Sequence, residues 1–276
     1  MTRSFAVALC LAVAASALAA TPATLKTTEF GRGPTIVFLH SMGGGRTSWL
    51  PTAKKLLGGH RVVMMDLPGH GDSPLPDPFS LEVAAEAVSQ TLAAQKAEST
   101  VVVGQGVGGV LALMVASAHP ERMRGIVLLD ATLKTEVQIP DHQQRNFFEF
   151  VDANYDQFLR MIFLPMGRDS AQGVVLHAQA AQAPPATIKA YFRELLRVDV
   201  SKALKGLKPQ LLVVNTEKRW PADKAWADIA RQTGYEGVDS TAARRIPSSG
   251  PLVATEQPDS LATILRQFTA QALAKK

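Results

Sequence analysis

The 276-residue sequence contains a single cysteine, Cys10, and only 6% of its residues are aromatic. One cysteine cannot form an intramolecular disulfide, so packing rather than covalent cross-links has to stabilise the fold. Hydrophobic residues make up 46% of the chain and charged residues 19%, the balance of a globular protein with a sizeable core. Alanine, valine and leucine supply most of that apolar content, which favours helices packed tightly on a sheet.

The sequence also lacks a concentration of charge. Its formal net charge is +5, and lysine and arginine are scattered without a basic block or interleaved aromatic residues. This pattern argues against a nucleic-acid-binding protein. The six histidines do not have the spacing of a metal site, and no His-Glu-x-x-His motif occurs, so we expect neither a metal nor a cofactor.

Residues 1–19 have the three parts of a secretory signal peptide. Arg3 gives a basic start, Ser4 to Leu18 is an apolar run, and Ala17-Leu18-Ala19 fits a cleavage site. The run is short for a membrane anchor, which needs roughly 20 apolar residues, and a buried first helix is the other alternative. We therefore expect a secreted or periplasmic protein whose domain, residues 20–276, has no stable membrane span.

Short apolar segments rich in β-branched residues alternate with longer segments of helical periodicity. Apolar runs of this length suit strands that are buried on both faces of a parallel sheet. The expected strands are 35–39, 61–65, 100–103, 125–129, 210–214 and 243–246, and the expected helices are 49–57, 81–95, 107–118, 222–233 and 258–273. The alternation predicts an α/β fold with a doubly wound, mostly parallel sheet. Between about 134 and 207 the pattern is helical, which predicts a helical lid inserted over the sheet.

Four stretches resemble, in order, the landmarks of the α/β-hydrolase superfamily. They are Phe38 to Gly44, similar to the segment that forms the oxyanion hole; Asp66 to Ser73, similar to its D-x-x-G-x-G-x-S segment; Val103 to Gly109, at the place of the nucleophile elbow; and Leu207 to Val214, similar to the strand before the catalytic acid. The resemblance implies an α/β-hydrolase fold over residues 20–276.

One motif leaves a different fold open. Gly104, Gly106 and Gly109 also fit the G-x-G-x-x-G pattern of a dinucleotide-binding site. Such a site needs an acidic residue about 20 positions further on, and Asp130 lies close to that place.

The side chains that a hydrolase of this family uses for chemistry are absent. The elbow requires Ser, Cys or Asp at its centre, where this sequence has Gly106, and no realignment within the elbow supplies one. The resemblance places the family's histidine at Pro251, and His177 is the last histidine of the chain. The acid position falls at Lys218, with Glu217 beside it, but an acid without a histidine to orient has no role in a triad.

Backbone donors do not depend on those side chains. By resemblance, the oxyanion hole would be formed by the N–H of Val107 and that of Ser41 or Met42. Ser41 stands where the family usually has glycine. Together with His40 and Gln105, these residues are the expected ligand-binding set.

Three functions are compatible with this pattern. The first is a non-hydrolytic pseudoenzyme that binds a small apolar or acyl ligand under the lid, or a protein partner that the sequence does not identify. The second is a serine-type ester hydrolase family member whose nucleophile at position 106 and histidine at position 251 are replaced in this chain. The third is a lyase or proton-transfer enzyme that uses His40 or Glu217. We expect the first, because nucleophile and base act as a unit and both are missing.

Overall fold

The computed structural model describes residues 24–135 and 140–274. The predicted signal peptide lies outside these residues. In the part described, no helix combines the length and the apolar character needed to cross a membrane.

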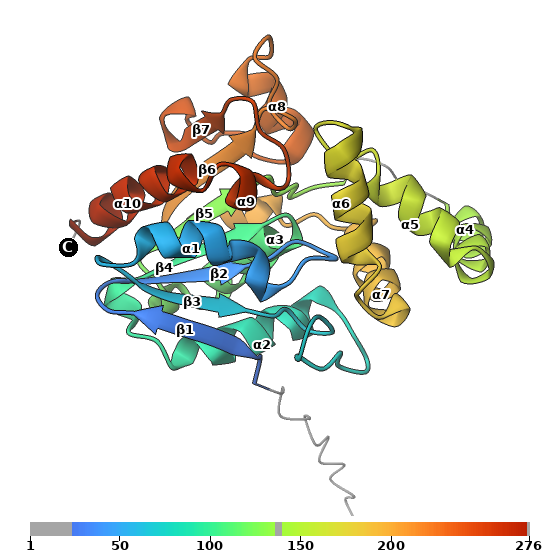
Figure 1. The fold of residues 1–276 in the computed structure, drawn as a ribbon, viewed down its shortest axis with the longest axis horizontal. Coiled ribbons are helices and arrows are strands. Elements are labelled where there is room, and N and C mark those ends of the chain that lie inside the picture. The colour runs from blue at the N-terminus through green and yellow to red at the C-terminus, as the bar shows by residue number, and fades with distance from the viewer. Residues whose placement is uncertain (1–23, 136–139, 275–276) are drawn as a thin grey trace, which may run out of the picture.

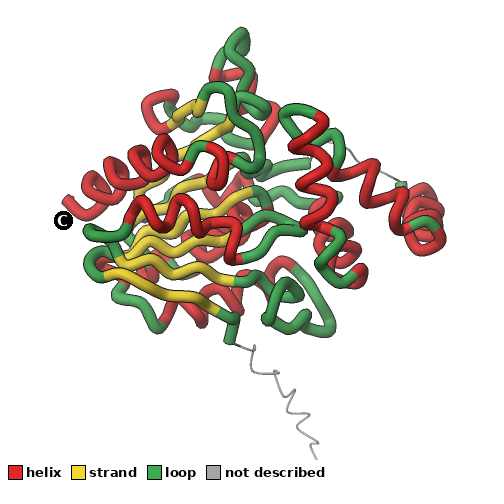
Figure 2. The backbone as a smooth tube through the Cα atoms, in the orientation of Figure 1, coloured by secondary structure: helices red, strands yellow, loops and turns green. Residues whose placement is uncertain are grey.

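One mostly parallel sheet forms the centre of the molecule (Figures 1 and 2). Its strand order is β1-β3-β2-β4-β5-β6-β7. The bounds are β1 Thr27–Gly31, β2 Thr35–Leu39, β3 Arg61–Met65, β4 Thr100–Gln105, β5 Gly125–Leu129, β6 Gln210–Thr216 and β7 Ala243–Ile246. Only β1 is antiparallel to its neighbour, β3, while the other pairs in the sheet are parallel. The predicted α/β fold class is confirmed.

Helices cover both faces of the sheet because successive strand residues point to opposite sides. On β2, Val37 and Leu39 belong to the core shared with α2 (Leu81–Ala93) and α3 (Val107–Ala118). Ile36 and Phe38 instead belong to the core shared with α1 (Leu50–Leu56) and α10 (Pro258–Ala274). Two buried layers of this kind are what a continuous apolar strand requires.

Six further α-helices are described. They are α4 Asp141–Ala153, α5 Tyr155–Phe163, α6 Ser170–Ala180, α7 Pro185–Leu195, α8 Trp226–Thr233 and the short α9 Val253–Glu256. Helices α4 to α7 occupy the interval 134–207 and form a group at one end of the sheet (Figure 1). This group has an apolar core of its own, which includes Phe158 and Ile188.

Candidate functional site

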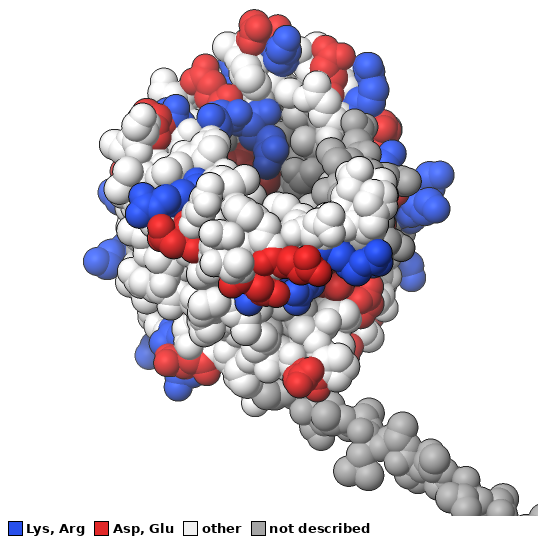
Figure 3. Space-filling model, turned by 90° about the vertical axis from the view of Figure 1, so that its right-hand side faces the viewer, with Lys and Arg blue, Asp and Glu red and all other residues white. Residues whose placement is uncertain are grey.

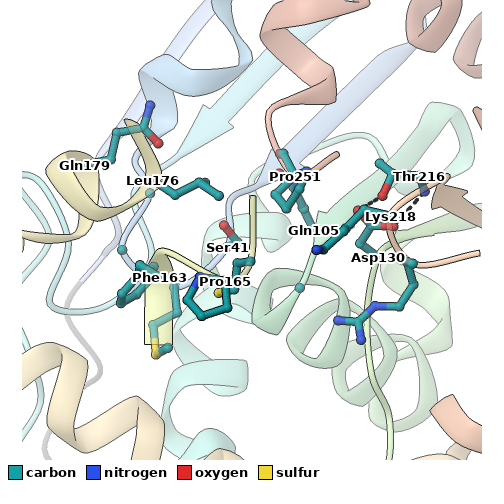
Figure 4. Close-up of a pocket in the computed structure, with 16 residues that line it drawn as sticks. Ser41, Gln105, Asp130, Phe163, Pro165, Leu176, Gln179, Thr216, Lys218 and Pro251 are labelled. Atoms are coloured by element: carbon teal, nitrogen blue, oxygen red, sulfur yellow. Dashed lines mark hydrogen bonds between the residues drawn. The ribbon is translucent and has the colours of Figure 1, made fainter. Parts of the chain in front are cut away.

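A cavity of about 330 Å³ lies between the carboxyl ends of the central strands and the helices α5 and α6. Figure 4 shows apolar side chains, Phe163 and Leu176, on one side of it and polar side chains, Asp130 and Lys218, on the other. A second cavity of about 300 Å³ shares several of its wall residues. Sites of this size and mixed polarity suit small organic ligands.

Gly106 stands at the turn where β4 ends and α3 begins. Its backbone angles are φ 54° and ψ −120°, a conformation that L side chains rarely adopt. Its N–H donates to the carbonyl of Leu129 on the neighbouring strand, at 3.0 Å. A Cβ at this position would lie 3.1 Å from the Cβ of Ser41. The turn therefore has the strand-to-helix geometry of a nucleophile elbow, without the side chain.

The other glycines of the elbow are explained by packing. A Cβ on Gly104 would collide with the backbone of Gly108 in the first turn of α3. A Cβ on Gly109 would lie 2.6 Å from the side chain of Ala131. These contacts account for the G-x-G-x-x-G pattern as close packing of a helix on a strand, with no dinucleotide required.

Two backbone segments that could donate to an oxyanion meet beside Gly106. Val107 is the first residue of α3, and its N–H is one that no carbonyl of the helix can accept. Ser41 and Met42 line both cavities, and Val107 lines the second. The helix N-terminus also carries a partial positive charge, which favours an anion at this place.

Two buried histidines hold the segment that follows β2. His40 accepts the N–H of Leu67 at its Nε2, at 3.0 Å, and its Nδ1 lies 2.8 Å from the carbonyl oxygen of Ser41. His70 accepts the N–H of Gly43 at its Nε2, at 3.1 Å. Burial lowers the pKa of His40 to about 4 and, together with the neighbouring His40, that of His70 to about 3. Both rings are therefore neutral near pH 7, and His40 faces backbone groups rather than the cavity.

Asp66 fixes the far end of the same segment. Its carboxylate accepts the N–H of Arg46 at 2.8 Å and that of Asp72 at 3.1 Å, and it also pairs with the Arg46 guanidinium. A Cβ on Gly71 would overlap this carboxylate, so glycine is required there. The D-x-x-G-x-G-x-S stretch thus positions the loop that carries Ser41 and Met42.

The structure brings together at the cavity the three positions that the resemblance assigned to nucleophile, acid and histidine. Gly106, Lys218 and Pro251 line it, and Gln105 donates from its Nε2 to the carbonyl of Pro251 at 2.7 Å. Glu217 is not on the wall. Its carboxylate instead accepts the N–H of Ser248.

Asp130, which the sequence offered only as the acid of a dinucleotide site, lies on this wall, and so does Arg219, which no sequence pattern singled out. Asp130 follows β5 directly and is only 8% exposed. Its carboxylate accepts the N–H and the hydroxyl of Thr216, both at 2.8 Å, and burial raises its pKa. An acidic residue immediately after a buried apolar strand was the available signal. Among the residues that the structure places, no group of three or more His, Cys, Asp or Glu side chains could hold a metal ion.

Replacing Gly106 with serine is expected to lower the free energy of unfolding by about 1–3 kcal/mol, because a non-glycine residue would be held at positive φ. Thermal unfolding measures the change. Gly58→Ser is the matched control, since Gly58 has φ 94° and a Cβ added there would meet nothing within 4 Å. We expect the Gly106 variant to lose more stability than the Gly58 variant, owing to Ser41. A Gly106 variant that melts higher than the unmodified chain would contradict the argument.

Comparison with known proteins agrees with this geometry. A family model described as alpha/beta hydrolase fold matches residues 34–211. A pimeloyl-[acyl-carrier protein] methyl ester esterase of Pseudoalteromonas atlantica is 33% identical over 133 residues, which cover 48% of this chain and 47% of that protein. The protein of the same name from Chromobacterium violaceum is 30% identical over 156 residues, covering 52% and 60%. The chain thus spans about half the length of these relatives.

A solved structure extends the likeness to most of the fold. The thermophilic esterase from Thermogutta terrifontis, with malate bound, superimposes with a TM-score of 0.72 and 20% identity over 90% of this chain and 93% of that one. The relatives are named as hydrolases. The expectation of a non-hydrolytic, ligand-binding pseudoenzyme is therefore contradicted, and the ester-hydrolase alternative agrees better with these names. With its sheet, its elbow and the matched family model, this chain belongs to the α/β-hydrolase fold family.

Proposed function

We propose that this chain acts on carboxylic esters, with the 330 Å³ cavity as the ester site. The observation that carries the proposal is the elbow at Gly106, where the first N–H of α3 meets the Ser41–Met42 loop beside an apolar wall. The relatives named as methyl ester esterases support the same substrate class. The signal-like residues 1–19 support a secreted or periplasmic location.

The backbone supplies the chemistry of this site. An ester whose carbonyl oxygen lies between the N–H groups of Met42 and Val107 gains stabilisation as negative charge develops on that oxygen. Loss of one such donor in other hydrolases costs about a hundredfold to a thousandfold in rate. The acyl chain would pack against Phe163 and Leu176 on the opposite wall.

Attack on the carbonyl carbon is the weak step in this chain. Gly106 and Pro251 stand where the family has its nucleophile and its base, so water has to attack directly and release the alcohol and the acid. Hydrolases stripped of their triad retain roughly 10³–10⁴-fold acceleration over water from the oxyanion hole and binding. The proposed activity is therefore slow ester hydrolysis.

Hydrolysis of methyl esters of short- and medium-chain acids tests the proposal. The unmodified chain is expected to exceed the buffer rate, and Gly106→Ser/Pro251→His is expected to exceed the unmodified chain by about tenfold or more, because nucleophile and base return together. Each single substitution is the control, since it restores only one partner. Buffer rates for both the unmodified chain and the double variant would overturn the proposal.

A further inference from the structure

Two basic side chains stand at the mouth of the cavity without a hydrogen-bonded acidic partner. Lys218 and Arg219 follow β6 after one intervening residue, Glu217, and both are exposed while lining the cavity. Within residues 24–135 and 140–274, neither side chain makes a hydrogen bond or a salt bridge. Figure 3 shows lysine and arginine atoms gathered along one edge of the hollow on this face.

The backbone holds these two residues in place. The N–H of Lys218 donates to the carbonyl of Ser249 at 3.1 Å, and that of Arg219 donates to the carbonyl of Thr216 at 3.0 Å. The turn is thereby joined to the loop that carries Pro251 on the cavity wall. The two charges are thus presented from a fixed turn rather than from a free loop.

The acidic side chains described near the mouth accept hydrogen bonds from groups other than Lys218 and Arg219. Asp130 is the acidic side chain on the described wall, and both its oxygens accept hydrogen bonds from Thr216. The charge of Arg219 acts on Asp130 from a distance and opposes the rise that burial causes in its pKa. Glu217 is turned to the N–H of Ser248. Even with Asp130 ionised, the described residues that line the cavity carry a net positive charge through Lys218 and Arg219, opposite the apolar side chains of α5 and α6.

We propose that Lys218 and Arg219 form a carboxylate subsite, and that the preferred esters carry a free carboxylate, as the half esters of short dicarboxylic acids do. A guanidinium binds a carboxylate with two parallel hydrogen bonds, and an ammonium adds a point charge. The hydrocarbon between the two carbonyl groups would lie along the apolar wall. This inference rests on the proposed ester function and assigns its substrate class.

Binding to the unmodified chain tests the subsite without any need for turnover. The probes are monomethyl glutarate and its neutral dimethyl ester, which differ by one charge and one methyl group. Because both cations are exposed, we expect the half ester to bind about three- to tenfold more tightly at about 20 mM salt and the preference to shrink at about 500 mM. Lys218→Ala/Arg219→Ala should abolish it, and Lys218→Glu/Arg219→Glu should reverse it.

Lys205→Ala/Lys208→Ala is the matched control. It removes the same charge before the amino end of β6, away from the cavity, and should leave the preference unchanged. The subsite is overturned if the half ester does not bind, if its preference survives both substitutions at 218 and 219, or if the control abolishes it equally. A charge preference with buffer rates of hydrolysis for both the unmodified chain and the Gly106→Ser/Pro251→His variant would refute the ester function alone. Hydrolysis without a charge preference would refute the subsite alone.

Discussion

Adding Ser41→Gly to the Gly106→Ser/Pro251→His variant is expected to raise its ester hydrolysis by a further factor of about ten to a hundred. A Cβ at position 106 would lie 3.1 Å from the Cβ of Ser41, closer than side chains normally approach. Either the new serine or the loop after β2 therefore has to shift by a few tenths of an ångström. The same loop carries Met42, a proposed oxyanion donor, so the shift would misplace the nucleophile, the donor or both.

Ser41→Ala in the same background separates crowding from chemistry. Alanine keeps the Cβ and loses only the hydroxyl, so it should not restore the rate that glycine restores. The measurement is kcat/KM on one methyl ester for the double variant and the two triple variants. Equal gains from alanine and glycine would show that the hydroxyl, and not the Cβ contact, limits the double variant.

The free energy of unfolding is expected to fall by several kcal/mol between about pH 6.5 and about pH 4, largely through His40 and His70. Both histidines have a pKa below the ordinary value of 6.5 in the folded chain, about 4 for His40 and about 3 for His70. In this window the unfolded chain binds more protons than the folded chain, so acid favours unfolding. For His40 alone the difference amounts to roughly 3 kcal/mol. Above about pH 6.5 this contribution is constant.

Urea unfolding at a series of pH values measures this effect. His70→Gln should flatten the pH dependence, because glutamine can still accept the N–H of Gly43 but does not titrate. His142→Gln is the control, since this side chain is exposed on α4 and should leave the dependence unchanged. If the curves of the unmodified chain and His70→Gln run parallel, His70 is not a source of the acid sensitivity.

The buried strands could be predicted from their apolar runs, and β2 and β3 begin and end at the predicted residues. The edge strand β1 was not predicted. It pairs only with β3, and its residues are half-buried or exposed, so it has no continuous apolar run. Helix α8 begins at Trp226 rather than at residue 222, because the chain forms a turn after Pro221. Local sequence patterns thus predict strands that are buried on both faces. They miss an edge strand that forms only by pairing with a distant strand.

The sequence also predicted only part of the site. Motif order brings Ser41, Gln105, Gly106 and Pro251 to one cavity, since the carboxyl ends of parallel strands meet at one edge. Spacing says nothing about side-chain direction. The ring of His40 turns to backbone groups and the carboxylate of Glu217 turns to a late loop, and neither direction can be read from the sequence. The expectation of a non-hydrolytic protein rested on the two missing side chains at positions 106 and 251. It gave less weight to the backbone donors around them.

The hydrogen bond from Gln105 to Pro251 has a consequence for the history of the site. The acceptor is a main-chain carbonyl, so any residue at position 251 would keep this bond, whatever its side chain. This hydrogen bond therefore holds the loop beside the elbow whichever side chain stands at position 251. Glycine to serine and proline to histidine can each arise from a single-base change in the codon, so the Gly106→Ser/Pro251→His variant lies a short mutational distance from this chain.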